Sequence, residues 1–506
     1  MVWQNGVANT SFFGEMSSMT NRFSMLCVWG LFVVGMGWSW TAAAEETRRP
    51  NIILILVDDL GWRDWSGAGN DICRTPHIDA LARDGMRFDQ AYAACAVCSP
   101  TRAAVQTGRY PARVGVTDWI RSRFQRPGGT TPEHNPTEYV GGKKQRVLCP
   151  PNPFWMELDE VTLAEMLRAE GYHTGYIGKW HLGDEAWYPE HQGFEENFGG
   201  CDYGQPPSYF DPFNQPRGRH ETLRAGIYRL PSRRPGEYLT DREADEACGL
   251  IERWKDDPFF IQLSHYAVHT PLQAPADDID KFSRDGVTRQ QATYAAMVAS
   301  VDRSLGRIRA KLKELNLEGN TILWFTSDNG GLDNNGNPTE NAPLRAGKGF
   351  PYEGGIRVPQ IIQWPGVIPA GGRSDVPVSS IDIVPTLAGW AGVEIPSEQV
   401  IDGIDLGPHV VAGGKQPVPE RPLLWHFPHY RGGISPYSIL REGEWKLITF
   451  YDGDPELYNL RLDPGETSNV ATQHPQRVKE MGERLHAALE AMGARFPIPN
   501  PNYDPS

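Results

Sequence analysis

The chain lacks a basic excess, an internal repeat and any low-complexity tract. Its 506 residues contain 49 Lys and Arg against 63 Asp and Glu, which gives a formal net charge of −14. Proteins that bind nucleic acid concentrate Lys and Arg to neutralise phosphates, so this composition argues against nucleic acid as a partner. The content of 40% hydrophobic and 22% charged residues is that of an ordinary globular chain, long enough for two domains.

Cysteine is scarce, and its spacing fits no zinc site. Of the seven cysteines, Cys95 and Cys98 form a C-x-x-C, but no second pair or suitably spaced histidines complete a metal site. Cys27 lies in an apolar N-terminal segment and Cys98 begins a motif, both described below; without these two, five cysteines remain for disulfides. An odd number allows at most two disulfides and leaves at least one free thiol, and a protein of this size does not require disulfides.

A long apolar run occurs only near the N-terminus. Arg22 precedes a mostly apolar stretch over 23–40, which is followed by the small residues Ala42 and Ala44. This pattern is typical of a secretory signal peptide, so we expect residues 1–44 to be removed and the protein to be secreted or periplasmic. A retained membrane anchor is the alternative. Three glycines and two serines within the run argue against it.

Three apolar runs later in the chain each end in polar residues. The runs are 51–57, followed by Asp58 and Asp59; 258–263, followed by His265 and His269; and 321–325, followed by Asp328 and Asn329. Continuous apolar runs of this length predict buried parallel strands. In open α/β sheets the functional site lies beyond the carboxyl ends of such strands. We therefore expect the site at the carboxyl ends of these three strands, where polar residues follow.

Helical patterns between these runs predict an α/β fold. They cover residues 163–169, which are closed by Gly171, and 294–312, where apolar residues recur at helical spacing. We expect residues 45–405 to form a domain with a large, mostly parallel central sheet flanked by helices. After Asp405 a Pro-rich stretch, a short strand at 445–450 and a helix near 476–492 predict a smaller C-terminal α+β domain over 406–506 with an antiparallel sheet.

Cys98 begins the segment Cys98-Ser99-Pro100-Thr101-Arg102, which continues to a Thr-Gly-Arg at 107–109. Pro100 suits the first turn of a helix, which puts Cys98 at a helix N-terminus, where the helix dipole favours anions. The segment resembles the signature of the sulfatase family, with Thr101 where members often have Ser or Ala. The resemblance implies an alkaline-phosphatase-like fold and oxidation of Cys98 to formylglycine by a formylglycine-generating enzyme. A buried thiol or disulfide partner is the alternative role of Cys98.

The resemblance also implies a metal site. Asp58, Asp59, Asp328 and Asn329 match the family's metal positions, and together with an oxygen of the modified Cys98 they are expected to hold a divalent cation. Ligation by oxygen alone indicates Ca²⁺, with Mg²⁺ as the alternative.

Two lysine segments resemble the family's sulfate-binding elements: Gly178-Lys179-Trp180-His181 and Gly347-Lys348-Gly349. By resemblance, Lys179 and Lys348 bind sulfate oxygens and Arg102 stabilises the hydrated aldehyde. His181 is expected to remove a proton so that sulfate is expelled, and His269 to protonate or hydrogen-bond the leaving oxygen. His265 is the nearest competitor of His269 for this role.

The substrate is expected to be a sulfated carbohydrate. In the C-terminal part, His426 and His429 lie in a segment that combines hydrogen-bonding groups with aromatic rings, as a sugar-binding wall needs. We weigh substrate contact by these histidines equally against a core or turn role. Two other functions remain open: a related hydrolase acting on phosphate esters or phosphonates, and a sulfated-glycan binder in which Cys98 is never converted.

Overall fold

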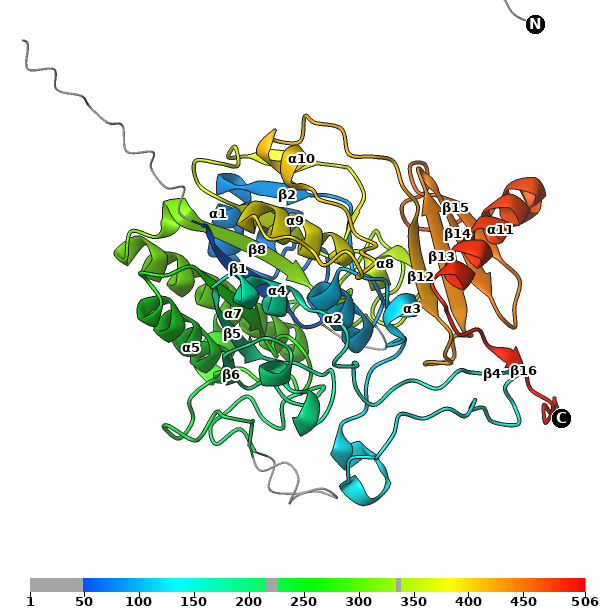
Figure 1. Cartoon of the computed structure of the whole chain (residues 1–506), viewed down its shortest axis with the longest axis horizontal. Helices are drawn as coiled ribbons and strands as arrows, with labels where there is room; N and C mark the ends of the chain where they lie inside the picture. Colours follow the sequence, from blue (N-terminus) through cyan, green and yellow to red (C-terminus); the bar gives the residue numbers. More distant parts are fainter. Residues whose placement is uncertain (1–48, 215–225, 334–337, 506) are drawn as a thin grey trace, which may run out of the picture. The chain divides into compact units, whose positions relative to one another are not determined.

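The computed structural model describes residues 49–214, 226–333 and 338–505 (Figure 1). The expected leader at 1–44, with Cys27, lies outside the described residues. Within the described ranges, no helix is both long and apolar enough to cross a membrane. The six cysteines in these ranges are all free thiols, so none of the disulfides that the composition allowed is formed among them.

The core of the molecule is an eight-stranded, mostly parallel sheet. In spatial order its strands are β10 (Gly372–Ser374), β2 (Met86–Phe88), β9 (Gln360–Gln363), β8 (Thr321–Ser327), β1 (Asn51–Val57), β7 (Phe259–Ser264), β5 (His173–Gly178) and β6 (Glu196–Phe198). The five strands from β8 to β6 are parallel, whereas β9 runs antiparallel to both of its neighbours. The large, mostly parallel sheet predicted from the sequence is therefore confirmed.

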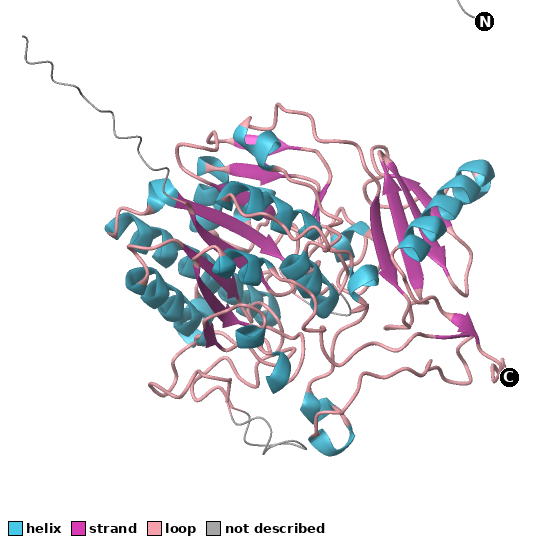
Figure 2. Cartoon of the chain, in the orientation of Figure 1, coloured by secondary structure: helices cyan, strands magenta, loops and turns pink. Residues whose placement is uncertain are grey.

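Helices cover the sheet in two groups whose members contact one another (Figures 1 and 2). One group is α1 (Pro76–Asp84), α5 (Leu239–Arg253), α6 (Ala276–Asp280) and α7 (Arg289–Glu314), and the other is α2 (Cys98–Thr107), α4 (Leu163–Ala169), α9 (Ile383–Ala391) and α10 (Gly407–Val411). Every residue of β1, β7 and β8 is buried. This double cover explains why those strands read as continuous apolar runs rather than alternating ones.

Helix caps account for the observed helix boundaries. α4 begins where the sequence predicts, because Thr162 and Glu165 form a capping box that satisfies the first free backbone N–H groups. α7 begins five residues before the predicted start at Tyr294. Thr288 and Gln291 form a second capping box there, ahead of the apolar repeat that the prediction followed.

The C-terminal part forms an antiparallel sheet, as expected (Figure 2). Its strands are β12 (Leu423–Phe427), β13 (Tyr437–Glu442), β14 (Trp445–Phe450) and β15 (Glu456–Asn459), in that order, and α11 (Pro475–Ala491) contacts β13 and β14. Two short pairs complete the strands: β3 (Ala91–Tyr92) with β11 (Val378–Ser379), and β4 (Val147–Leu148) with β16 (Ile498–Pro499). Two further short α-helices are α3 (Pro111–Val114) and α8 (Glu353–Ile356).

The antiparallel sheet packs directly against the segment that carries Cys98. Alternate residues such as Trp425 and Ile439 share a buried cluster with Ala96 and Val97, while Leu424 and Leu440 face Leu485 of α11. This alternation follows from the two-residue period of a strand. The C-terminal sheet therefore supports the chain immediately before α2.

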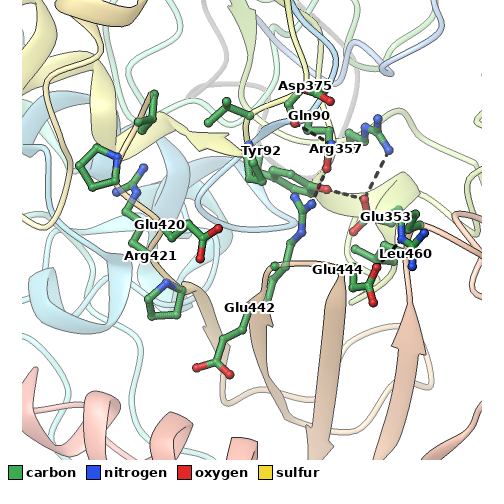
Figure 3. A pocket seen from close by; sticks show the side chains of 18 of the residues that line it. Gln90, Tyr92, Glu353, Arg357, Asp375, Glu420, Arg421, Glu442, Glu444 and Leu460 are labelled. Carbon is green, nitrogen blue, oxygen red and sulfur yellow. Dashed lines mark hydrogen bonds and ion pairs between the residues drawn. The ribbon is translucent and has the colours of Figure 1, made fainter. Parts of the chain in front are cut away.

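A cavity of about 960 Å³ lies where the C-terminal sheet meets the larger sheet's loops (Figure 3). Its wall includes Tyr92, Glu353 and Arg441, and the Tyr92 hydroxyl donates to Glu353 at 2.7 Å. None of the residues predicted to carry chemistry lines this cavity.

Candidate active site

Strand register brings the polar residues that follow the strands to one edge of the sheet. Val57 of β1 lies opposite Ser327 of β8, so Asp58 and Asp328 emerge side by side. Gly178 of β5 lies opposite Ser264 of β7, which brings Lys179 to the same edge. The carboxyl ends of the strands thus assemble the site that the three apolar runs predicted.

Backbone conformation turns two of the predicted residues into this cluster. Asp59 and His181 both adopt the left-handed region, each with φ of 62°, which is uncommon for residues other than glycine. Successive strand residues point to opposite faces, so the left-handed turn allows Asp59 to join Asp58 at the strand end. Its backbone N–H donates to Asp328 Oδ1 at 3.2 Å, and Asn329 Nδ2 donates to Asp59 Oδ1 at 2.8 Å. Strained residues of this kind concentrate at functional sites.

Cys98 is the first residue of α2, as predicted from Pro100. The Thr101 hydroxyl accepts from the backbone N–H of Cys95 at 3.0 Å and fixes the chain that enters the helix. The Cys98 sulfur and one carboxylate oxygen each of Asp58 and Asp328 lie within 4.8 Å of one another. The helix N-terminus therefore lies against the carboxylates at the end of the sheet.

Three cations are buried with these carboxylates. Arg102 donates from Nε to Asp328 Oδ2 at 2.9 Å, and its Nη2 lies 2.7 Å from the same oxygen. Lys179 Nζ donates to Asp58 Oδ2 at 2.7 Å and Lys348 Nζ to Asp59 Oδ1 at 2.5 Å. Three cations thus face three carboxylates, and such pairing is what keeps buried charge tolerable.

The three carboxyl groups differ in the direction of their pKa shifts, because the nearby cations act on them unequally. Burial raises the pKa of Asp58, and the nearby Asp328 and Asp59 raise it further, against the effect of Lys179 and Arg102. Burial also opposes ionisation of Asp59, but Lys348, His269 and Lys179 outweigh burial and lower its pKa. For Asp328, Arg102 and Lys179 similarly overcome burial, and its pKa is lowered.

The donor set fits a divalent cation. Among the described residues, three buried oxygens of the cluster have no hydrogen-bonding partner: Asp58 Oδ1, Asp59 Oδ2 and Asn329 Oδ1. Buried polar atoms without a partner need an explanation, and an ion is one of the few available. Hard oxygens of carboxylates and carboxamides are the ligands of Ca²⁺ and Mg²⁺, which agrees with the predicted set.

His181 and His269 border the cluster, and their surroundings favour the neutral imidazole. Burial lowers the pKa of His181, and Lys179 and Arg102 lower it further; its Nε2 lies 2.7 Å from the Ile120 carbonyl oxygen. Burial and Lys348 lower the pKa of His269 to about 3, and its Nε2 lies 3.6 Å from Asp59 Oδ2.

His269 and His265, the two candidates for the leaving-group role, have different contacts. His265 has Nδ1 at 2.6 Å from Glu243 and Nε2 at 3.0 Å from the Ser304 hydroxyl, so both ring nitrogens are occupied within the core. His269 instead has Nδ1 on the Thr270 carbonyl, and its Nε2 is directed to Asp59. These contacts favour His269 as the residue at the site.

His426 and His429 each form hydrogen-bonding contacts with other protein groups. His426, in β12, has Nδ1 at 2.8 Å from the Ser438 hydroxyl and Nε2 at 3.1 Å from the Arg495 carbonyl oxygen. The contacts of His426 therefore favour its core alternative over substrate contact. His429 Nε2 lies 2.8 Å from the Thr117 hydroxyl, which ties the C-terminal part to the segment that reaches the Ile120 carbonyl beside His181.

Sequence reasoning did not single out several residues that hold the cluster. Ser99 donates to the His181 carbonyl and accepts from Ile120 N–H, both at 2.9 Å. Arg431 lies 3.8 Å from Asp118, on the segment just before Ile120. Ser99 lies inside the Cys98 motif and could have been noticed there. The pairing of Arg431 with Asp118 spans the chain and leaves no local signal.

Comparison with known proteins agrees with this geometry. The family model described as Sulfatase matches residues 50–393, and a second model, "N-sulphoglucosamine sulphohydrolase, C-terminal", matches residues 346–495. N-acetylgalactosamine-6-sulfatase of Sus scrofa is 33% identical, with 93% of this chain and 85% of that protein covered. Arylsulfatase A of Homo sapiens is 30% identical, with 89% and 90% covered.

Solved structures show the same fold. The crystal structure of Ps i-CgsB in complex with k-i-k-neocarrahexaose has 31% sequence identity and a TM-score of 0.74, and covers 87% of this chain and 93% of that one. The PsFucS1 sulfatase from Pseudoalteromonas sp. has 26% identity and a TM-score of 0.68, with 90% and 92% covered. The chain therefore belongs to the sulfatase family and is a sulfuric ester hydrolase.

Proposed function

We propose that this enzyme cleaves sulfate esters of carbohydrates, using formylglycine made from Cys98 and a divalent cation. The observation that carries the proposal is the position of Cys98. It begins α2 beside Asp58 and Asp328, with the ammonium groups of Lys179 and Lys348 on the same carboxylate cluster. A nucleophile at a helix N-terminus, surrounded by cations, is suited to an anionic ester.

The cation site consists of Asp58, Asp59, Asp328 and Asn329, with the modified Cys98 as a further ligand. Ca²⁺ is the preferred ion and Mg²⁺ the alternative, because every donor is a hard oxygen. When bound, the ion supplies Lewis-acid polarisation of a sulfate oxygen and offsets charge in the transition state. Since three carboxylates already balance three basic side chains, a dication leaves the site net positive toward the sulfate ester.

The surrounding side chains position the ester and move protons. Lys179 and Lys348 hold sulfate oxygens, and Arg102, fixed by Asp328, stabilises the nucleophile. The lowered pKa of His181 keeps it neutral at pH 7, as a base that removes the proton of the sulfated residue must be. His269, which is neutral at pH 7 because burial and Lys348 lower its pKa to about 3, donates a hydrogen bond to the leaving oxygen. Formylglycine supplies a hydrated aldehyde whose hydroxyl is the nucleophile.

The relatives support a carbohydrate substrate. N-acetylgalactosamine-6-sulfatase names a sulfated sugar, and Ps i-CgsB was solved with a neocarrahexaose. Steryl-sulfatase of Homo sapiens, at 32% identity, shows that other alcohols occur among the relatives. A terminal sugar of a sulfated polysaccharide is the substrate class we propose, and small aryl sulfates serve as test substrates.

The proposed enzyme also requires conversion of Cys98 and export from the cell. A formylglycine-generating enzyme converts Cys98, and the leader at 1–44 directs export to the periplasm or the medium. Residues 45–405 form the catalytic domain and residues 406–506 the C-terminal subdomain, whose sheet packs against the segment preceding Cys98.

The direct test compares turnover of paired esters by protein exported from its native host. We expect 4-nitrophenyl sulfate to be hydrolysed faster than 4-nitrophenyl phosphate, Cys98→Ala to abolish turnover, and Cys248→Ala to retain it. Cys248 is the matched control because it is a free thiol on α5 and does not belong to the groups of carboxylates and Cys98 that could hold a metal. Faster phosphate turnover would identify a phosphoester hydrolase. Binding of sulfated saccharides without turnover would identify a glycan-binding protein.

A further inference from the structure

The loop after β12 reaches the segment that borders the reacting centre. At one point of contact, His429 Nε2 lies 2.8 Å from the Thr117 hydroxyl; at the other, Arg431 Nη1 lies 3.8 Å from Asp118 Oδ1. Backbone hydrogen bonds in both directions between Arg431 and Ile434, at 3.2 and 2.8 Å, close the turn that carries the arginine. The C-terminal part therefore delivers one guanidinium to a fixed position.

The backbone of Asp118 is also held in place, by the side chain of Asn152. Asn152 Oδ1 accepts from the backbone N–H of Asp118 at 2.9 Å, and Asn152 Nδ2 donates to the Asp118 carbonyl at 3.1 Å. Two residues later, Ile120 N–H donates to Ser99 and the Ile120 carbonyl contacts His181. Asp118 is thus attached through a short backbone path to Cys98's neighbour and to the expected base.

Arg431 also contacts the loop of the second sulfate lysine. A Cβ placed on Gly349 would lie 2.8 Å from Arg431 Nε and 3.1 Å from its Cδ, so this glycine leaves room for the arginine beside Lys348. Burial raises the pKa of Asp118 to about 6, although Arg431 lowers it. Arg431 therefore lies against the Lys348 loop, and Asp118 lies two residues before Ile120, whose backbone N–H donates to Ser99.

Asp118 and Arg431 are partly exposed, unlike the residues of the catalytic cluster. Cys98 is 3% exposed and Lys179 is 0% exposed, whereas the side chains of Asp118 and Arg431 are 22% and 31% exposed. Their 3.8 Å separation is longer than a hydrogen bond, so neither group saturates the other. A carboxylate acceptor and a guanidinium donor at this spacing can bind neighbouring hydroxyl groups of a sugar ring.

We propose that Arg431 and Asp118 bind the hydroxyl groups of the sugar that carries the scissile sulfate, and so determine preference for saccharide over aryl esters. The inference rests on the proposed function and adds the element that recognises the alcohol. An aryl sulfate offers no ring hydroxyls to this pair. Loss of either side chain therefore weakens saccharide turnover more than aryl sulfate turnover, mainly through KM.

The test measures kcat and KM on 4-nitrophenyl sulfate, N-acetylgalactosamine 6-sulfate and carrageenan oligosaccharides. In Arg431→Ala and Asp118→Asn, the ratio of kcat/KM on the best saccharide to that on the aryl sulfate is expected to fall by about tenfold to a hundredfold, as loss of charge-assisted hydrogen bonds predicts. Arg431→Lys keeps the charge but loses the planar fork, so its ratio falls as well. This variant decides the matter if the alanine variant does not fold.

Arg484→Ala is the matched control, since Arg484 is another arginine of the C-terminal part, paired with Glu442 on the surface. Its ratio is expected to equal that of the wild type. Unchanged ratios in the Arg431 and Asp118 variants overturn the inference, as does wild-type turnover of the aryl sulfate without turnover of any saccharide. Neither result touches sulfate-ester hydrolysis itself. Absence of wild-type turnover on every ester, with Cys98 converted, is the separate outcome that removes the proposed function.

Discussion

Lys179 donates to Asp58 across 2.7 Å, and both side chains are completely buried. A buried ion pair of this kind adds little net stability, because removing both charges from water offsets their attraction. The pair is better explained as preparation for an anionic ligand and a cation. In the proposed function, sulfate oxygens replace part of the contact of Lys179 with Asp58. Asp58 Oδ1 has no hydrogen-bonding partner.

Cation binding is expected to stabilise the fold. Calcium that fills the three unpartnered oxygens binds the folded state alone, which contributes about 3 kcal/mol at a hundredfold excess over its dissociation constant. The melting temperature should therefore rise on addition of CaCl₂ and fall with EDTA. Asp59→Asn should reduce this response. A melting temperature that calcium and EDTA leave unchanged contradicts the assigned cation site.

Removal of Arg102 is expected to impair both stability and turnover. Arg102→Ala leaves Asp328 as a buried charge without its main partner, which costs about 3–5 kcal/mol. Turnover of 4-nitrophenyl sulfate should fall by about a hundredfold or more, as for loss of a group that stabilises developing charge. Urea unfolding and steady-state kinetics measure the two effects separately. A variant with wild-type kinetics would show that Arg102 has only a structural role.

Substitution of His269 is expected to change turnover, whereas substitution of His265 is expected to change stability. His269→Ala removes a side chain at the site, so kcat should fall by about a hundredfold with little change in unfolding. His265→Ala instead leaves the Glu243 carboxylate and the Ser304 hydroxyl without their partner, which costs about 2–3 kcal/mol of stability. The reverse pattern would assign the leaving-group role to His265.

Burial of His426 predicts a pH dependence of stability. Burial lowers its pKa to about 4, against about 6.5 in an unfolded chain. Between these values the unfolded state binds more protons than the folded state, so this histidine's contribution is present above pH 6.5 and is lost as pH falls toward 4. The urea midpoint of the wild type should fall more steeply over this window than that of His426→Leu. Parallel slopes would contradict the neutral, buried state.

The parts of the fold with strong local signals could be predicted from the sequence. The strand at 51–57 has the predicted bounds, and β8 extends two residues beyond Phe325 toward Asp328. The cluster was predictable because parallel strands present their carboxyl ends together. The left-handed conformations of Asp59 and His181 were not, since neither position is a glycine, the residue that usually marks this conformation in a sequence.

The contact between Arg431 and Asp118 joins segments that lie far apart in the chain. The segment containing His426, His429 and Arg431 was recognised from its composition, but alternation along β12 turns His426 into contact with Ser438 and Arg495. Which side chain of that segment meets Asp118 depends on a turn more than 300 residues later in the chain. Sequence periodicity carries no information about such a contact.

The proposed chemistry depends on the conversion of Cys98 to formylglycine. Mass spectrometry of the peptide that contains this residue, from protein exported by its native host, measures that conversion. We expect an aldehyde at position 98, with Cys95 in the same peptide remaining a thiol. An unmodified thiol at position 98 in protein that hydrolyses sulfate esters would rule out formylglycine as the nucleophile.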